Sequence, residues 1–154
     1  MGAFVCGAVL VATLLLCLLS REKAPYQRQE ALFTDCELKF LRVLDEAAGK
    51  RFRVFGKVRM ADIIGVAEEI HGKDYRRAFS RIVGKHLDFV LCDPETLAPR
   101  CAIELDDSSH ERDERRARDQ FVDCAMEAAG LPLIHVPVEK SYDVTELRKI
   151  LASI

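Results

Sequence analysis

The sequence predicts an α/β domain in which a small mixed sheet is flanked by helices, preceded by an apolar N-terminal segment. Three observations support this fold class. Residues 86–92 and 101–106 are apolar, β-like runs joined by a short turn, as in a hairpin. Residues 34–48 and 111–129 have the apolar spacing of helices, and each run stops at a glycine. Residues 131–138 form a further strand-like run after the second helix.

Composition limits the class of protein. Hydrophobic residues make up 49% of the chain and charged residues 31%, which is typical of a globular domain. A net charge of -2 argues against a general polyanion binder but does not exclude local basic patches. The cysteines show no C-x-x-C spacing, so we interpret them as free thiols rather than zinc ligands. We expect Cys36, Cys92, Cys101 and Cys124 to be buried.

The N-terminal run, residues 3–19, contains no charged residue. As a helix it would be about 25 Å long, near the short end for spanning a bilayer. A cleaved signal peptide is the alternative, but no Lys or Arg precedes the run and no A-x-A site follows it. Arg21 and Lys23 follow at once, which places the rest of the chain in the cytoplasm. We expect a transmembrane anchor over 1–20, a linker over 21–33 and a domain over 34–154; a buried soluble helix is a third alternative.

The first half of the domain has four expected elements. Thr34 and Glu37 form a capping box that opens a helix ending at Gly49. Residues 52–58 alternate apolar and basic side chains, which predicts a half-exposed strand. Helices are predicted over 61–70 and 75–83, and the second of these stops at Gly84.

The second half begins with the hairpin, whose turn is formed by residues 93–96. The helix over 111–129 is charged in its first half and apolar in its second. Because the strand over 131–138 contains Pro132 and Pro137, we expect its ends at a sheet edge or a bend. A second capping box, Asp143 with Glu146, opens a final helix to about residue 151.

Three carboxylates lie on the predicted hairpin strands. Glu104 and Asp106 share one face of their strand because side chains alternate, and Asp88 opens the neighbouring strand. Two carboxylates on one face repel each other unless a cation lies between them. The three residues therefore predict a Mg²⁺ or Mn²⁺ site beside a phosphate. The alternative is that all three are solvated at exposed strand ends.

Two further residues have open assignments. Glu37 is either only the capping-box partner of Thr34 or also an outer metal ligand that projects from the first helix. His110 is either a proton-transfer group, since its usual pKa lies near neutrality, or a surface residue at a helix start. His71 and His135 have no visible partner and are interpreted as structural.

Basic residues suggest a surface for nucleic acid. The stretch from 50 to 59 contains no acidic residue, and Lys85 precedes the hairpin. With Arg76, Arg77 and Arg81 these residues could follow a phosphate backbone, or they could be ordinary exposed charges. The candidate nucleic-acid-binding residues are Lys50, Arg51, Arg53, Lys57, Arg59 and Lys85.

These residues resemble a known family. The string from Glu104 to His110, followed by Arg118-Asp119 and by residues 129–134, is similar to a bacterial family of proteins of unknown function, DUF2726. The order helix–strand–strand–strand–helix–strand, with Asp on one central strand and Glu on the next, resembles the PD-(D/E)XK, or restriction-endonuclease-like, nuclease core. The chain also resembles very-short-patch-repair endonuclease-like domains. The resemblance covers roughly residues 34–152.

The resemblance implies roles for particular residues. The metal-binding Asp of the superfamily falls on Asp88, its Glu on Glu104 and its first-helix Glu on Glu37. The superfamily Lys two residues after the Glu is Asp106 in this chain. Either Lys85 or His110 substitutes for that Lys, or Asp106 is a third metal ligand, or the site is inactive.

The leading hypothesis is a Mg²⁺-dependent nuclease-like domain on the cytoplasmic side of a bacterial inner membrane, acting on DNA or RNA. Asp88, Glu104, Asp106 and His110 are its expected catalytic residues, and Glu37 its outer ligand. The second hypothesis is an inactive nuclease-fold module that binds nucleic acid or a protein partner, which Asp106 in place of Lys favours. A purely structural membrane protein is the third, and it leaves the carboxylates on apolar strands unexplained.

Overall fold

The computed structural model describes residues 24–106 and 113–154. The chain divides into two units between Leu32 and Phe33, and residues 24–32 of the first form neither helix nor strand. The second unit, residues 33–154, is called the domain below. Within the described residues, no helix has both the length and the apolar character needed to cross a bilayer. The anchor expected over 3–19 lies outside these residues and stays a prediction.

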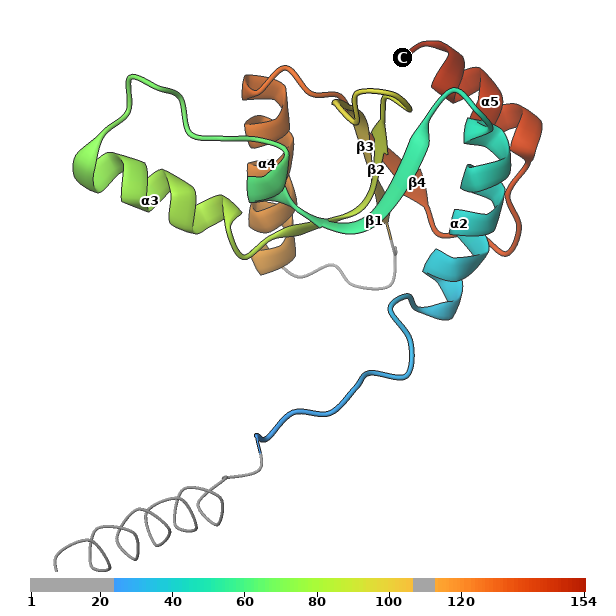
Figure 1. Cartoon of the computed structure of the whole chain (residues 1–154), viewed down its shortest axis with the longest axis horizontal. Helices are drawn as coiled ribbons and strands as arrows, with labels where there is room; N and C mark the ends of the chain where they lie inside the picture. The colour runs from blue at the N-terminus through green and yellow to red at the C-terminus, as the bar shows by residue number, and fades with distance from the viewer. Residues whose placement is uncertain (1–23, 107–112) are drawn as a thin grey trace, which may run out of the picture. The chain divides into compact units, whose positions relative to one another are not determined.

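A four-stranded mixed sheet forms the centre of the domain (Figure 1). Its strands are β1 (Arg53–Arg59), β2 (His86–Cys92), β3 (Pro99–Asp106) and β4 (Leu133–Pro137), in the order β1-β2-β3-β4. The pairs β1–β2 and β2–β3 are antiparallel, whereas β3 and β4 are parallel and are linked through a helix. The predicted hairpin and the predicted α/β class are confirmed, and β4 lies at a sheet edge, as its prolines require.

Helices cover both faces of this sheet. The helices α2 (Asp35–Ala48) and α5 (Val144–Ala152) lie on one side, and α3 (Gly72–Ile82) and α4 (Asp113–Ala128) on the other (Figure 1). The short 3₁₀ helix η1 (Met60–Asp62) follows β1. Each face has its own apolar cluster. The buried members beneath α2 and α5 are Phe40, Leu44, Ala48, Phe52, Phe89, Leu91, Cys101, Ile103, Val136, Leu147 and Leu151. Those on the other face are Met60, Ile64, Ile82, Leu87, Val90, Cys92, Ala102, Val122 and Met126.

The helix termini agree with the sequence signals. Glu37 N–H donates to Thr34 Oγ1 and Thr34 N–H to Glu37 Oε2, so the capping box is formed. Asp143 caps α5 by accepting hydrogen bonds from two backbone N–H groups of its first turn. Gly49 and Gly130 follow α2 and α4 with φ values of 54° and 67°, which glycine adopts without strain.

The prediction of a helix over 61–70 is wrong. Only Met60–Asp62 is helical there, as one 3₁₀ turn, and residues 63–70 form turns and irregular backbone. Ile63, Ile64 and Val66 are β-branched and flank Gly65, so the local helix propensity is low. Ile64 instead packs into the core beside η1.

The expectation of four buried thiols is confirmed for only two. Cys92 and Cys101 are buried in the clusters on opposite faces of the sheet, and burial raises the pKa of Cys101 to about 11. Cys36 and Cys124 are exposed. Cys36 lies one turn ahead of the first buried residue of α2, and Cys124 lies on the side of α4 opposite Val122.

Phe33, the first residue of the domain, covers part of one sheet face. Its ring stacks on Phe89 with a centroid distance of 5.7 Å and an interplanar angle of 15°. The same ring covers Gly56 of β1, where an added Cβ would lie 2.3 Å from Phe33 Cζ. Because Gly56 has no side chain, it leaves room for the Phe33 ring.

We expect Phe40→Ala to destabilise the domain by about 3–5 kcal/mol, because it removes a fully buried ring and leaves a cavity. The Phe40 ring lies 5.4 Å from that of Phe89 and 4.9 Å from that of Tyr142, centroid to centroid. Urea unfolding measures the change. Leu38→Ala, on the same helix at an exposed position, is the matched control and should cost far less. Equal losses for the two variants would contradict this account of the core.

Candidate functional site

Asp88 lies where the ladder between β2 and β3 stops. The last backbone pair of that ladder joins Phe89 to Ile103, and one residue further along the two strands stand Asp88 and Glu104. Here the Asp88 side chain takes the place of a backbone acceptor. Its Oδ2 accepts a hydrogen bond of 3.0 Å from the backbone N–H of Leu105. The carboxylate is thus fixed beside the Glu104–Leu105 peptide, with only 18% of its side chain exposed.

An ammonium group from β1 meets this carboxylate. Lys57 Nζ donates to Asp88 Oδ1 at 3.2 Å and also to Glu37 Oε1 of α2. The Lys57 side chain is 31% exposed and that of Glu37 is 13% exposed, so all three groups are partly withdrawn from water. One ammonium therefore lies between two carboxylates, and it joins α2, β1 and β2.

The backbone of Lys57 is unusual. Its φ is 55°, a left-handed conformation that costs a residue with a Cβ about 1 kcal/mol or more. Such a conformation persists only where the surroundings hold it. Here the flanking residues Gly56 and Val58 pair with β2, and the two carboxylates bind the ammonium at the end of the side chain.

Glu37 is the capping-box partner of Thr34 and also binds Lys57, whereas its role as an outer metal ligand stays a prediction. Its Oε2 completes the capping box with Thr34, while its Oε1 accepts from Lys57. Burial, the largest single influence, raises the pKa of Glu37, but the hydrogen bonds from Lys57 and Thr34 and the charge of Lys57 together outweigh it. The pKa of Glu37 therefore falls below its usual value. Burial likewise opposes the charge of Lys57, yet Glu37 and Asp88 raise its pKa. At neutral pH Lys57 is an ammonium and Glu37 a carboxylate.

Asp106 belongs to a different cluster. Its Oδ1 lies 3.1 Å from Nδ1 of His135 on β4, and His135 Nε2 lies 2.9 Å from Asp123 Oδ1 on α4. The imidazole thus bridges two carboxylates through opposite ring nitrogens. Burial alone would lower the pKa of His135, but Asp106 and Asp123 raise it. His135, interpreted from sequence as structural and without a partner, is in fact the centre of this cluster.

The described residues assemble the predicted metal ligands only in part. Glu37 and Asp88 both bind the ammonium of Lys57. Their carboxylate oxygens are also the kind of ligand that Mg²⁺ prefers. Glu104 lies half-buried next to them along β3. Over 24–106 and 113–154, however, no three His, Cys, Asp or Glu side chains are grouped so as to hold a metal ion. His110, the predicted proton-transfer group, lies outside the described residues.

The predicted nucleic-acid-binding residues are spread along the domain. Arg51 donates to the backbone oxygen of Leu151 at 2.9 Å, and Arg59 pairs with Asp62. Lys57 is held by the two carboxylates described above. The residues Arg53 and Arg59 lie at opposite ends of β1, about 20 Å apart. Lys50 and Arg53 are exposed, and Lys85 is half-buried.

Sequence reasoning placed Lys57 on the nucleic-acid surface but did not connect it with Asp88. One signal existed, since Gly56 interrupts the apolar pattern of β1, and a glycine inside a strand suggests an irregular backbone there. The sequence spacing of Asp106, Asp123 and His135 does not indicate that they meet. His135 of β4 comes close to Asp106 of β3 because the two strands pair in parallel.

We expect Lys57→Met to raise the pKa of Glu37 and to move acid unfolding to a higher pH. A carboxyl whose pKa is lowered in the folded state adds stability above its unfolded pKa, and this is lost as pH falls through the folded value. Without the ammonium, burial raises the Glu37 pKa and that contribution disappears. A carboxyl-carbon NMR titration and circular dichroism against pH measure the two effects. Lys50→Met, at an exposed position, should change neither; an unchanged Glu37 titration in Lys57→Met would refute the assignment.

We expect the stability lost in His135→Gln to shrink as pH rises from 6 to 9. A histidine with a raised folded pKa stabilises fully below its unfolded pKa, about 6.5, and loses this as pH rises through the folded value. Urea unfolding at three pH values measures the difference from wild type. His71→Gln, in an exposed loop, serves as the control. A loss independent of pH would show that the two carboxylates do not act through the imidazolium.

Comparison with known proteins gives one match. No curated protein and no solved structure matches the chain. The sequence model of the family described as "Protein of unknown function (DUF2726)" matches residues 29–154, which include the whole domain. The chain therefore belongs to the DUF2726 family.

Proposed function

We propose that the domain hydrolyses phosphodiester bonds in DNA or RNA with the help of Mg²⁺ or Mn²⁺. The observation that carries this proposal is the fixed Asp88 carboxylate, placed where β2 and β3 part and paired with the ammonium of Lys57. The order of elements around the sheet agrees with the resemblance to the restriction-endonuclease-like core. A fold alone does not establish a reaction, and this group of side chains is what supports hydrolysis.

Lys57 supplies the positive charge that the sequence lacks at position 106. The superfamily pattern expects a Lys there, on β3, and this chain has Asp106, which is bound to His135 instead. Lys57 reaches Asp88 from β1, on the other side of β2. Because its pKa is raised, it remains protonated at neutral pH. Its role in this proposal is therefore to donate a hydrogen bond to the phosphate and stabilise developing charge, not to accept a proton.

In the proposed site, Asp88 and Glu104 are the residues that hold the divalent ion, and Glu37 positions Lys57 from α2. A bound Mg²⁺ or Mn²⁺ would offset phosphate charge and lower the pKa of an attacking water. The N–H of Leu105 binds Oδ2 of Asp88 and restricts the rotamer of this side chain, while Oδ1 accepts from Lys57. Such positioning by a neighbouring group is typical of metal-binding carboxylates.

We expect the full-length protein to cleave nucleic acid when Mg²⁺ or Mn²⁺ is added, and Asp88→Asn and Glu104→Gln each to lower the rate by about a hundredfold or more. Asn keeps an oxygen that can accept from Leu105, so the fold should survive. Gel-based cleavage of single- and double-stranded DNA and RNA measures activity, and circular dichroism checks folding.

Glu95→Gln, in the exposed turn between β2 and β3, is the matched control and should cleave as wild type does. If wild type and Glu104→Gln behave alike on all four substrates, the hydrolase proposal fails.

A second candidate function is favoured by Asp106 and by the incomplete ligand set among the described residues. In that case the domain binds nucleic acid or a protein partner without cleaving it. Calorimetric titration with Mn²⁺ separates the two: no heat of binding, together with salt-sensitive binding of nucleic acid, selects the inactive module.

A further inference from the structure

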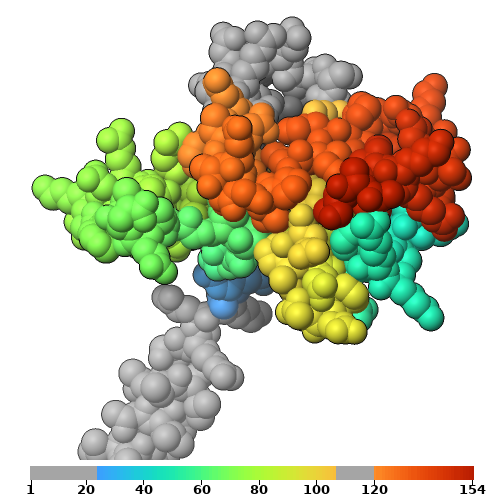
Figure 2. Space-filling view, turned by 90° about the horizontal axis from the view of Figure 1, so that it is seen from above, coloured from blue at the N-terminus to red at the C-terminus, as the bar shows by residue number. Residues whose placement is uncertain are grey.

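The helix α3 is almost entirely exposed, although it connects two strands of the central sheet. Only Ile82 of its side chains is buried, and Ala78 is half-buried. Figure 1 shows α3 at the side of the domain away from α2 and α5, and Figure 2 shows this segment, in green, standing out from its neighbours. A helix so weakly packed has its surface available for a partner.

Two aromatic rings lie on this exposed surface. Tyr75 is 42% exposed and Phe79 is 37% exposed. Their ring planes are nearly parallel, with an interplanar angle of 7° and a centroid distance of 5.9 Å. They follow each other at i and i+4, so they form a stacked pair along the helix, and the pair is partly solvated.

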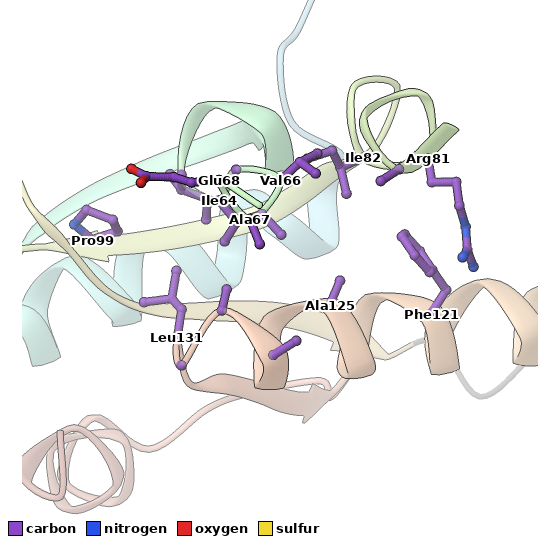
Figure 3. A pocket seen from close by; sticks show the side chains of 16 residues that line it. Ile64, Val66, Ala67, Glu68, Arg81, Ile82, Pro99, Phe121, Ala125 and Leu131 are labelled. Atoms are coloured by element: carbon purple, nitrogen blue, oxygen red, sulfur yellow. The ribbon is translucent and has the colours of Figure 1, made fainter. Parts of the chain in front are cut away.

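Basic side chains cover much of the remaining surface of α3, with Arg76 next to the aromatic pair and the others further round the helix. Lys73, Arg76, Arg77 and Arg81 are exposed on α3, and Asp74 is the only acidic residue in the helix. At the end of the helix, the Arg81 guanidinium carbon lies 3.9 Å from the ring centroid of Phe121 on α4 (Figure 3). The ammonium of Lys85 lies 5.4 Å from the same centroid. Two cations are thus held at one aromatic ring just before β2 begins.

We propose that α3 binds single-stranded nucleic acid, with bases stacked on Tyr75 and Phe79 and phosphates contacted by Arg76, Arg77 and Arg81. Binding of single strands combines aromatic faces with cations, since every base offers a stacking face and every phosphate a negative charge. On α3 the chain would pass from the aromatic pair over Arg76 to the cations further round the helix. This inference rests on the proposed function and names its substrate class. Lys85 immediately precedes β2, so the cations extend to the strand that carries Asp88.

Two other partners fit the surface less well. In a duplex the base faces are stacked on each other, so the exposed rings would gain nothing from it. A membrane surface requires a broad apolar face, because adsorption scales with the apolar area buried. On α3 the neighbouring apolar positions, Ala78 and Ile82, are turned into the domain, which leaves only parts of two rings.

The test measures binding without cleavage. Full-length protein in a buffer with EDTA is titrated into a labelled, mixed-sequence single-stranded DNA, the same sequence as a duplex, and vesicles containing an anionic lipid. We expect Tyr75→Ala/Phe79→Ala to weaken single-strand binding by about tenfold or more. The control, Leu38→Ala on α2, removes a side chain of similar exposure and should bind as wild type does.

A second pair of variants tests the phosphate contacts. Arg76→Gln/Arg77→Gln should lower the slope of log K against log salt by about 1.4, because each single-strand phosphate contact contributes about 0.7. Lys39→Gln/Arg42→Gln on α2 makes the same change in net charge at exposed positions and should leave the slope unchanged.

Three outcomes overturn the inference: wild type does not bind the single strand, the aromatic variant binds it normally, or the aromatic variant loses duplex or vesicle binding equally. Circular dichroism and unfolding midpoints show whether each variant is folded. Cleavage is measured separately with Mg²⁺. Retained single-strand binding without cleavage refutes only the hydrolase proposal, and cleavage with unaltered binding in the α3 variants refutes only this inference.

Discussion

The ammonium of Lys57, shared by Glu37 and Asp88, is the interaction on which the candidate site depends. It joins the first helix to two strands, and through Asp88 it reaches the backbone of a third, because Leu105 donates to the same carboxylate. Four elements thus meet at a few polar atoms beside an otherwise apolar sheet face. Removing any member leaves a charged or hydrogen-bonding group partly buried and unpaired, which costs more than the contact itself contributes.

The apolar layers beside this cluster explain why its geometry is fixed. Both sheet faces are covered, and the buried rings of Phe40 and Phe89 lie under the same helix that carries Glu37. Glu37 also caps that helix, so its side chain is held at both carboxylate oxygens. A carboxylate restrained in this way loses little further entropy on binding a cation.

Much of the fold could be predicted from local sequence chemistry. The capping residues Thr34 and Asp143 and the stops at Gly49 and Gly130 determine helix ends, and Pro137 requires an edge strand. These signals act within a few residues, which is why single-sequence reasoning finds them. The helix predicted over 61–70 failed because apolar residues near Gly65 pack under tertiary constraints that a periodic pattern does not contain.

The site was less predictable, because its members meet only through strand register. The sequence indicates Asp88 and Glu37 as metal ligands, which stays a prediction. The ammonium that joins them comes from a residue with left-handed backbone, which no spacing rule indicates. Asp106 was expected beside Asp88, yet the parallel pairing of β3 and β4 brings it to His135.

The close approach of Phe33 to Gly56 limits which pairs of residues fit at these two positions. The ring occupies the place where a side chain at position 56 would stand, so the two positions share one fixed volume. A larger residue at 56 is compatible with this packing only if the ring at 33 moves away or is replaced by a smaller side chain. Position 56 directly precedes Lys57, so a residue that displaced the Phe33 ring would change the packing beside the candidate site.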